Sequence, residues 1–292
     1  MARPGVRRAP AGSCGNVCGM DQHGPIGVFD SGLGGLSVLR ELVRLVPHDD
    51  IVYVADSAHV PYGTKPPAFI QKRSLAIARF LVDCLHARGV VVACNTATTH
   101  AVATLRQTFP AVPIVGMEPA VKPAAAATRS GVVGVLATPA TLDGERFADL
   151  VERYTDGIEL LTQPSPGLVE CVETGDVDGP ETERLLRAFT GPMMGRGADT
   201  IVLGCTHYPF LRDTLQRLVG PDVTLIDTGE AVARQTVRVL GIGDRHGGRR
   251  STREDNPAGR ITYYSSGDVN EAKRVIELLM HQPVECVLPL PV

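Results

Sequence analysis

The sequence predicts an α/β protein made of two pseudo-symmetric domains, each an open parallel sheet. Short apolar runs rich in β-branched residues alternate with longer segments of helical periodicity along most of the 292 residues. This pattern is typical of parallel strands covered by helices. Two of the apolar runs, VVAC and IVLGC, end in a cysteine, Cys94 and Cys205 respectively. Hydroxyl-bearing residues follow each cysteine. Because ligands bind at the carboxyl ends of strands in such sheets, both cysteines are expected at one site.

Composition is that of an ordinary globular protein. Hydrophobic residues make up 43% of the chain and the formal net charge is −3, so the charge balance favours neither nucleic acid nor an anionic membrane as a partner. Trp is absent, which disfavours surfaces that stack on bases. We find no apolar run long enough to span a bilayer and no apolar segment behind the N-terminal arginines, so we expect a cytoplasmic protein.

The other cysteines carry no clear chemistry. Seven cysteines in a long cytoplasmic chain are not expected to form a disulfide framework. Cys14 and Cys18 stand near His23, but the spacing is loose and a fourth ligand is missing, so no metal is expected there. Cys84 and Cys286 lie in helical or apolar patterns and are expected to be buried and inert.

The first element pair surrounds a glycine-rich turn. An apolar strand over 26–29 is followed by DSGLGG and then by the helical run LSVLRELVRLV. A strand, a glycine-rich turn and a helix present backbone N–H groups to an anion. The turn lacks both the GxGxxG pattern and the lysine of a P-loop. It therefore suits a carboxylate better than a nucleotide.

The following elements continue the alternation. A strand over 51–55 opens into the turn DSAHVPYGTKPP, whose Pro and Gly indicate a surface loop. Helical periodicity covers 69–87, and 241–259 is polar and Gly-rich, as in a mobile surface loop. The other expected strands are 90–93, 112–116, 131–136, 158–161, 201–203, 223–227 and 261–265, and the other expected helices are 98–107, 142–154, 181–194, 210–219 and 269–280.

The two cysteine segments form an internal pseudo-repeat. Cys94 lies 26 residues before Ala120, and Cys205 lies 26 residues before Ala231. Both spans run from cysteine through hydroxyl residues, a helix with TLRQ or TLQR, an apolar strand, a glutamate and an alanine. Such a repeat would place the two cysteines face to face.

A pair of cysteines admits several chemistries. A metal site needs more ligands than two cysteines and His207 provide, a redox pair usually shows CxxC, and nucleophilic catalysis leaves one thiol unexplained. Two thiols that flank a substrate can instead remove a proton from a carbon and return one on the opposite face. That reaction would invert a stereocentre.

Long motifs in this order resemble the glutamate racemase family, whose members interconvert L- and D-glutamate without a cofactor and supply D-glutamate for peptidoglycan. The matching stretches are FDSGLGGLSVLREL (29–42), YVADSAHVPYGTK (53–65), VVACNTAT (91–98), GVLATPAT (134–141), LVE (168–170), IVLGCTHYPFL (201–211), IDTGEAVA (226–233) and YYSSGDV (263–269). The resemblance implies an active site between two domains, no cofactor or metal, and a homodimer. It also implies a first domain of 25–118 plus 232–292 and a second domain of 119–231. The Gly, Pro and Arg content of 1–24 separately indicates a flexible tail.

The resemblance also implies roles for single residues. Cys94 and Cys205 match the two catalytic bases, with Asp30 assisting the first, His207 assisting the second, and Glu170 an acid near His207. The substrate-binding positions are Asp30, Ser31, Tyr62, Gly63, Asn95, Thr96, Thr138, Thr141, Thr206 and His207.

Alternatives stay open for some residues and for the activity. Ser31, Thr96 and Thr206 could also cap helices, which strand-to-helix turns favour, and Asp56 and Lys65 are expected on the loop surface. The rival activities are an aspartate racemase of the same superfamily and a binding protein that has kept the pocket without turnover.

Overall fold

The computed structural model describes residues 24–242 and 258–292. The expected tail, apart from its last residue, and most of the expected loop over 241–259 lie outside the described residues, as do Cys14, Cys18 and His23.

The first domain contains a six-stranded, fully parallel sheet with the order β10-β9-β2-β1-β3-β4. Its strands are β1 (Ile26–Asp30), β2 (Ile51–Ala55), β3 (Gly89–Val92), β4 (Ile114–Val115), β9 (Ile261–Ser265) and β10 (Val287–Pro289). Alternate side chains of β1 enter different cores, Val28 on one face and Phe29 on the other. A sheet buried on both faces in this way needs helices on each side.

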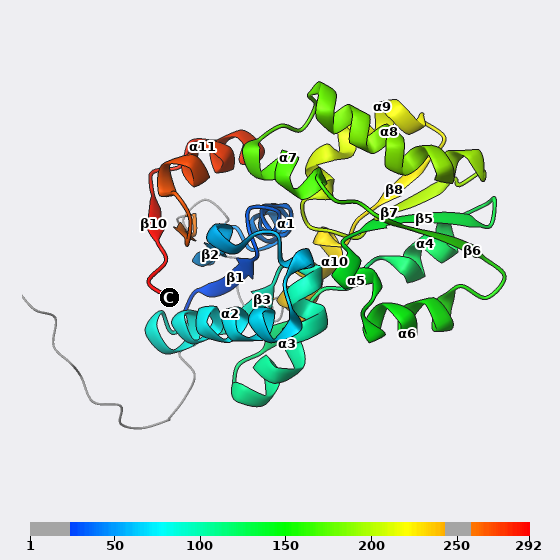
Figure 1. Ribbon diagram of the computed structural model, residues 1–292. Coiled ribbons are helices and arrows are strands. Elements are labelled where there is room, and N and C mark those ends of the chain that lie inside the picture. The colour runs from blue at the N-terminus through cyan, green and yellow to red at the C-terminus, as the bar shows by residue number, and fades with distance from the viewer. Residues whose placement is uncertain (1–23, 243–257) are drawn as a thin grey trace, which may run out of the picture.

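Helices cover both faces of this sheet (Figure 1). One face packs on α2 (Pro67–Arg79), which continues as a π-helical turn over Phe80–Cys84, and on α3 (Asn95–Thr108). The other packs on α1 (Leu36–Leu45), α10 (Gly229–Val239) and α11 (Val269–Met280). Short 3₁₀ turns over Ser57–His59 and Tyr62–Thr64 lie in the loop after β2.

The second domain contains a four-stranded parallel sheet with the order β6-β5-β7-β8. Its strands are β5 (Val132–Ala137), β6 (Glu159–Pro164), β7 (Thr200–Leu203) and β8 (Thr224–Ile226). Its helices are α4 (Val121–Ala127), α5 (Pro139–Leu142), α6 (Glu145–Tyr154), α7 (Leu168–Thr174), α8 (Pro180–Gly195) and α9 (Arg212–Val219), and a 3₁₀ turn covers Tyr208–Leu211.

The two sheets repeat one topology. If the first four strands of each domain are numbered 1 to 4 along the chain, they lie side by side in the order 2-1-3-4 in both sheets. These orders are β2-β1-β3-β4 and β6-β5-β7-β8. Cys94 follows β3 and Cys205 follows β7, which are equivalent strands. The predicted fold class of two pseudo-symmetric parallel sheets is therefore confirmed.

Some local expectations were wrong. Five elements were not predicted as such: the helices α4, α5, α7 and α10 and the final strand β10. Cys84 and Cys286 are exposed rather than buried. The helical pattern expected over 69–87 ends as a helix at Arg79, and the π turn that follows leaves Cys84 outside the core.

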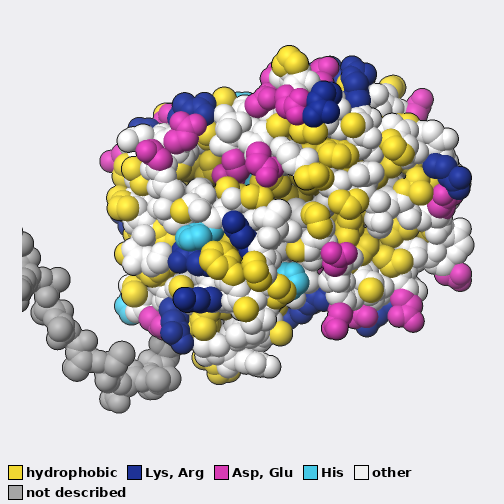
Figure 2. Space-filling model, in the orientation of Figure 1, with side chains coloured by type: hydrophobic (Ala, Val, Ile, Leu, Met, Phe, Trp, Pro, Cys, Tyr) yellow, Lys and Arg dark blue, Asp and Glu magenta, His cyan; other side chains and the backbone are white. Residues whose placement is uncertain are grey.

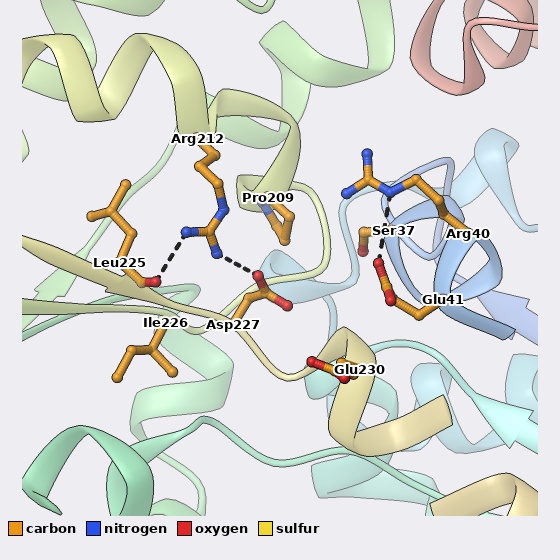
Figure 3. A pocket seen from close by; sticks show the side chains of 9 residues that line it. All are labelled: Ser37, Arg40, Glu41, Pro209, Arg212, Leu225, Ile226, Asp227 and Glu230. Atoms are coloured by element: carbon orange, nitrogen blue, oxygen red, sulfur yellow. Dashed lines mark hydrogen bonds and ion pairs between the residues drawn. The ribbon is translucent and has the colours of Figure 1, made fainter. Parts of the chain in front are cut away.

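The domains meet along α1 as well as at the strand ends. The buried Ser37 hydroxyl of α1 lies 2.8 Å from the carbonyl oxygen of Thr206, in the turn after β7. Beside Ser37, a surface hollow lies between α1 and the segment after β8, where Arg212 binds the carbonyl of Leu225 and the carboxylate of Asp227 (Figure 3). The contact between Ser37 and Thr206 thus links the two sheets.

No helix within the described residues is long and apolar enough to cross a membrane. On the face shown in Figure 2, basic and acidic side chains are interspersed among apolar ones.

Candidate active site

A small cavity lies where the carboxyl ends of the two sheets face each other. Side chains from both domains line it: Ser31, Pro61, Tyr62, Gly63, Cys94, Asn95, Thr96, Thr138, Thr141, Val169, Cys205, Thr206 and His207. The residues after β1, β3, β5 and β7 all reach it, so both sheets present equivalent strand ends to one space.

The first half of the site is built around Asp30 and Cys94. Asp30 ends β1, is fully buried, and accepts N–H bonds from Ser31 at 2.7 Å and from Gly35 at 2.6 Å. Cys94 caps α3, with the Ala97 N–H 3.4 Å from its sulfur. Burial, and next the Asp30 carboxylate, raise the pKa of Cys94 well above its usual value. Cys94 therefore rests as the thiol.

The second half is built around Cys205 and His207. The Cys205 sulfur lies 3.6 Å from Nδ1 of His207, and Oε1 of Glu173 lies 2.6 Å from Nε2 of the same ring. Burial lowers the pKa of His207, but the contacts with Cys205 and Glu173 outweigh burial and raise that pKa well above its usual value. The raised pKa favours the positively charged form of the ring, which lies beside the Cys205 sulfur.

The acid in this half is Glu173 rather than the expected Glu170. Both lie on α7, but Glu170 is exposed at the first turn. Glu173 lies one turn later, where its carboxylate accepts the N–H of Leu33 at 2.5 Å and contacts His207. Glu170 makes no such contact because the phase of α7 directs the later side chain to the glycine-rich turn, and its expected role as an acid near His207 stays a prediction.

The two halves are joined across the domain interface. The Thr206 hydroxyl donates to Oδ2 of Asp30 at 3.2 Å, so the residue after Cys205 holds the acid beside Cys94. A Cβ on Gly34 would collide with the His207 ring. Glycine at that position lets the first domain's turn approach the second domain closely.

Polar groups without charge line the rest of the cavity. The hydroxyls of Thr96, Thr138 and Thr141 lie 2.9 to 3.4 Å apart in a triangle that spans both domains. Asn95 is buried, and its Oδ1 has no hydrogen-bond partner among the described residues. A buried acceptor without a partner is costly, so Asn95 offers a place for a ligand's N–H groups.

Tyr62 and Gly63 form the wall contributed by the loop after β2. The Tyr62 hydroxyl donates to Oδ2 of Asp56 at 2.5 Å. Asp56 is fully buried, so its expected position on the loop surface was wrong. It lies directly after β2, where the sheet, rather than the loop, decides its exposure.

Among the described residues, no group of three or more His, Cys, Asp or Glu side chains could hold a metal ion.

A family model described as Asp/Glu/Hydantoin racemase matches residues 26–236. The chain belongs to this racemase family. A glutamate racemase of Ectopseudomonas mendocina (strain ymp) is 51% identical over 261 residues, which cover 89% of this chain and 96% of that relative. The resemblance inferred from the motifs is thus confirmed.

Solved racemase structures share the two-domain fold. Glutamate racemase from Francisella tularensis subsp. tularensis SCHU S4, in complex with D-glutamate, has a TM-score of 0.76 at 28% identity and covers 92% of this chain and 98% of that one. Escherichia coli glutamate racemase, in complex with L-glutamate and the activator UDP-MurNAc-ala, has a TM-score of 0.78 at 32% identity, with 91% and 98% covered.

Most residues singled out in the sequence meet at the cavity of this racemase-family member. All of them line it except Asp30, which contacts Cys94 and Thr206 from behind, and Glu170, which faces solvent. Two contacting groups were missed, Glu173 and the buried Asp56. The signal for Glu173 was a second acid three residues after the first, on the same helix.

Proposed function

We propose that the protein is a glutamate racemase, an isomerase that interconverts L- and D-glutamate and supplies D-glutamate for peptidoglycan. The observation that carries the proposal is the pair of buried cysteines at equivalent strand ends, which line one cavity in a racemase-family fold. Glutamate is the substrate because the relatives at about half identity are glutamate racemases.

The reaction is a proton transfer at Cα. One cysteine, as thiolate, takes the α-proton and becomes a thiol. The electron pair of the broken C–H bond remains on Cα, so the substrate becomes a planar carbanion. The other cysteine, as thiol, gives its proton to the opposite face and becomes a thiolate. The raised pKa of Cys94 and the His207 cation beside Cys205 favour a start with Cys94 as acid and Cys205 as base. The roles exchange with the direction of reaction.

In this proposal no cofactor delocalises the negative charge of the carbanion, so the dipoles of the cavity must stabilise that charge. Hydroxyls of Thr96, Thr138 and Thr141 and the N-terminus of α3 bind the carboxylate groups, and Oδ1 of Asn95 accepts from the ammonium. In a site that excludes water, these preorganised groups stabilise the charge that develops on the carboxylate in the transition state. Asp30 and His207 assist the thiols Cys94 and Cys205, respectively. Ser31, Tyr62, Gly63 and Thr206 complete the substrate shell.

The proposal extends to the organisation of the molecule. The first domain comprises 25–118 plus 232–292, the second comprises 119–231, and the protein acts as a cytoplasmic homodimer. The two sheets support this division, since each draws its strands from one of those ranges. Sedimentation at several protein concentrations tests the dimer.

The decisive experiment removes one thiol at a time. Cys94→Ala and Cys205→Ala should each lower racemisation of glutamate by on the order of 1000-fold or more, because each removes one of two obligatory proton carriers. Circular dichroism of the substrate measures the rate, and aspartate assayed alongside tests the rival substrate. Either variant with near-normal turnover would refute the two-base mechanism.

Isotope exchange separates an enzyme from a binding protein. In D₂O, each single-cysteine variant should still exchange the α-proton of one enantiomer without inverting it, and the two variants should select opposite enantiomers. A wild-type protein that bound glutamate but incorporated no deuterium would be a binding protein instead.

A further inference from the structure

We propose that Arg73 is a positioning residue for the substrate-binding loop and acts through Asp56 and Tyr62. The inference rests on the proposed function, because it concerns the wall of the same cavity. Arg73 does not line that cavity. Its effect on the substrate must therefore pass through the residues that it holds.

The contact between Arg73 and Asp56 is bidentate. Nε of Arg73 lies 2.9 Å from Oδ2 of Asp56, and Nη2 lies 2.7 Å from Oδ1. The side chain of Asp56 is fully buried and that of Arg73 is 14% exposed. Paired, parallel hydrogen bonds of this kind fix the orientation of a carboxylate as well as its charge.

Asp56 transmits that orientation to the loop. Its Oδ2 also accepts the Tyr62 hydroxyl at 2.5 Å, and its Oδ1 lies 3.0 Å from Nδ1 of His59. Arg73 on α2 thus anchors both 3₁₀ turns of the loop through one carboxylate.

The other anchors of the loop lie at its first turn, where the Ala58 N–H donates to the Ser266 hydroxyl at 3.0 Å and the His59 ring packs against Phe69. Between positions 57 and 65, Tyr62 is the only buried residue. The neighbouring Gly63 lies so close to Thr138 of the second domain that a Cβ there would come within 2.7 Å of the threonine Cβ. A small rotation of Tyr62 would therefore change both the wall of the cavity and the fit between the domains.

Kinetics of three arginine variants test the role. Arg73→Gln should raise KM for glutamate about tenfold and change kcat by less than about threefold, as expected when binding rather than chemistry is lost. Arg73→Lys, which keeps the charge without the planar fork, should fall between wild type and Arg73→Gln. Arg79→Gln is the matched control, since Arg79 is an exposed arginine on the same helix, and it should leave KM unchanged.

Alkylation of the thiols gives a second readout that needs no activity. Cys94 and Cys205 are buried beside the loop, whereas Cys84 and Cys286 are exposed and serve as internal references. In Arg73→Gln, iodoacetamide should modify the two buried thiols at least about fivefold faster relative to the references, because local opening exposes them. The same ratio in Arg79→Gln should equal that of wild type.

The outcomes separate the two proposals. A wild type that does not racemise glutamate would refute the proposed function, and the alkylation ratios would still decide the role of Arg73. Unchanged KM and alkylation in a folded Arg73→Gln would overturn the positioning role, as would a fall in kcat at constant KM. If Arg73→Gln does not fold, Arg73→Lys decides by the same two measurements.

Discussion

Glu173 holds His207 from the side opposite Cys205. Its carboxylate oxygen lies 2.6 Å from Nε2, while the Cys205 sulfur lies 3.6 Å from Nδ1. Glu173→Gln removes a charge that keeps the pKa of His207 high, so we expect kcat/KM to fall on the order of 100-fold. Because the enantiomers have equal free energy, the loss must be the same in both directions. Circular dichroism from pure L- and pure D-glutamate measures both.

Glu170→Gln is the control for this prediction. Glu170 lies on the same helix and is exposed, so its loss should leave kcat/KM within about twofold of wild type. An equal loss in both variants would mean that the charge of α7 as a whole, rather than the contact with His207, supports the reaction.

At the scale of residues, sequence patterns found the groups that follow strands. Cys94, Cys205 and Thr138 come directly after apolar runs, and the end of a parallel strand fixes where they point. Glu173 could not be chosen over Glu170 in this way, because the choice depends on how α7 packs against a turn about 140 residues earlier. Asp56 was misplaced for a similar reason, since its partner Arg73 lies on another element.

At the scale of elements, Asp199 joins the end of α4 to the start of β7. Its carboxylate accepts from the Thr128 hydroxyl at 2.6 Å and from the N–H groups of Arg129 and Ser130 at 2.7 and 2.8 Å. Burial raises the pKa of Asp199, but these hydrogen bonds outweigh it and hold the pKa well below its usual value. Asp199→Ala should lower the free energy of unfolding by about 2 kcal/mol at pH 7, as measured by urea titration.

The pH dependence of that loss has a definite sign. The folded carboxylate binds its proton less readily than the unfolded one, so its stabilisation is present above the unfolded pKa and is lost as the pH falls below about 4. The stability difference between wild type and Asp199→Ala should therefore shrink in acid. A difference that stayed constant down to pH 3 would contradict the assigned pKa.

Most long, periodic elements were predicted from the sequence, whereas the eleven-residue α10 and several short elements were not. The predicted strand over 26–29 and helix over 269–280 have strong patterns of their own. By contrast, α4 has only seven residues and β10 only three. β10 exists because it pairs with β9 at the edge of a sheet already formed. Such tertiary pairing leaves little signal in the local sequence.

At the scale of the whole molecule, the site exists only while the two domains keep their position relative to each other. Each sheet contributes one thiol from the same position of a repeated strand order, and Thr206 of the second domain bonds Asp30 of the first. The 26-residue spacing after each cysteine predicted the repeat. It could not predict the contacts that set the distance between the halves, because these involve residues outside the repeat.

Ser37 provides the last test of this coupling. Its buried hydroxyl lies 2.8 Å from the carbonyl of Thr206 and 2.8 Å from that of Gly34, so Ser37→Ala removes the donor that these two carbonyls share. We expect a loss of about 1–2 kcal/mol in unfolding free energy and a fall in kcat/KM of about tenfold, because the two halves shift apart. Thr236→Val is the matched control, since its buried hydroxyl bonds only the carbonyl of Val232 within α10. It should lose similar stability and keep its activity, whereas equal activity in both variants would show that the interdomain bond does not set the geometry of the site.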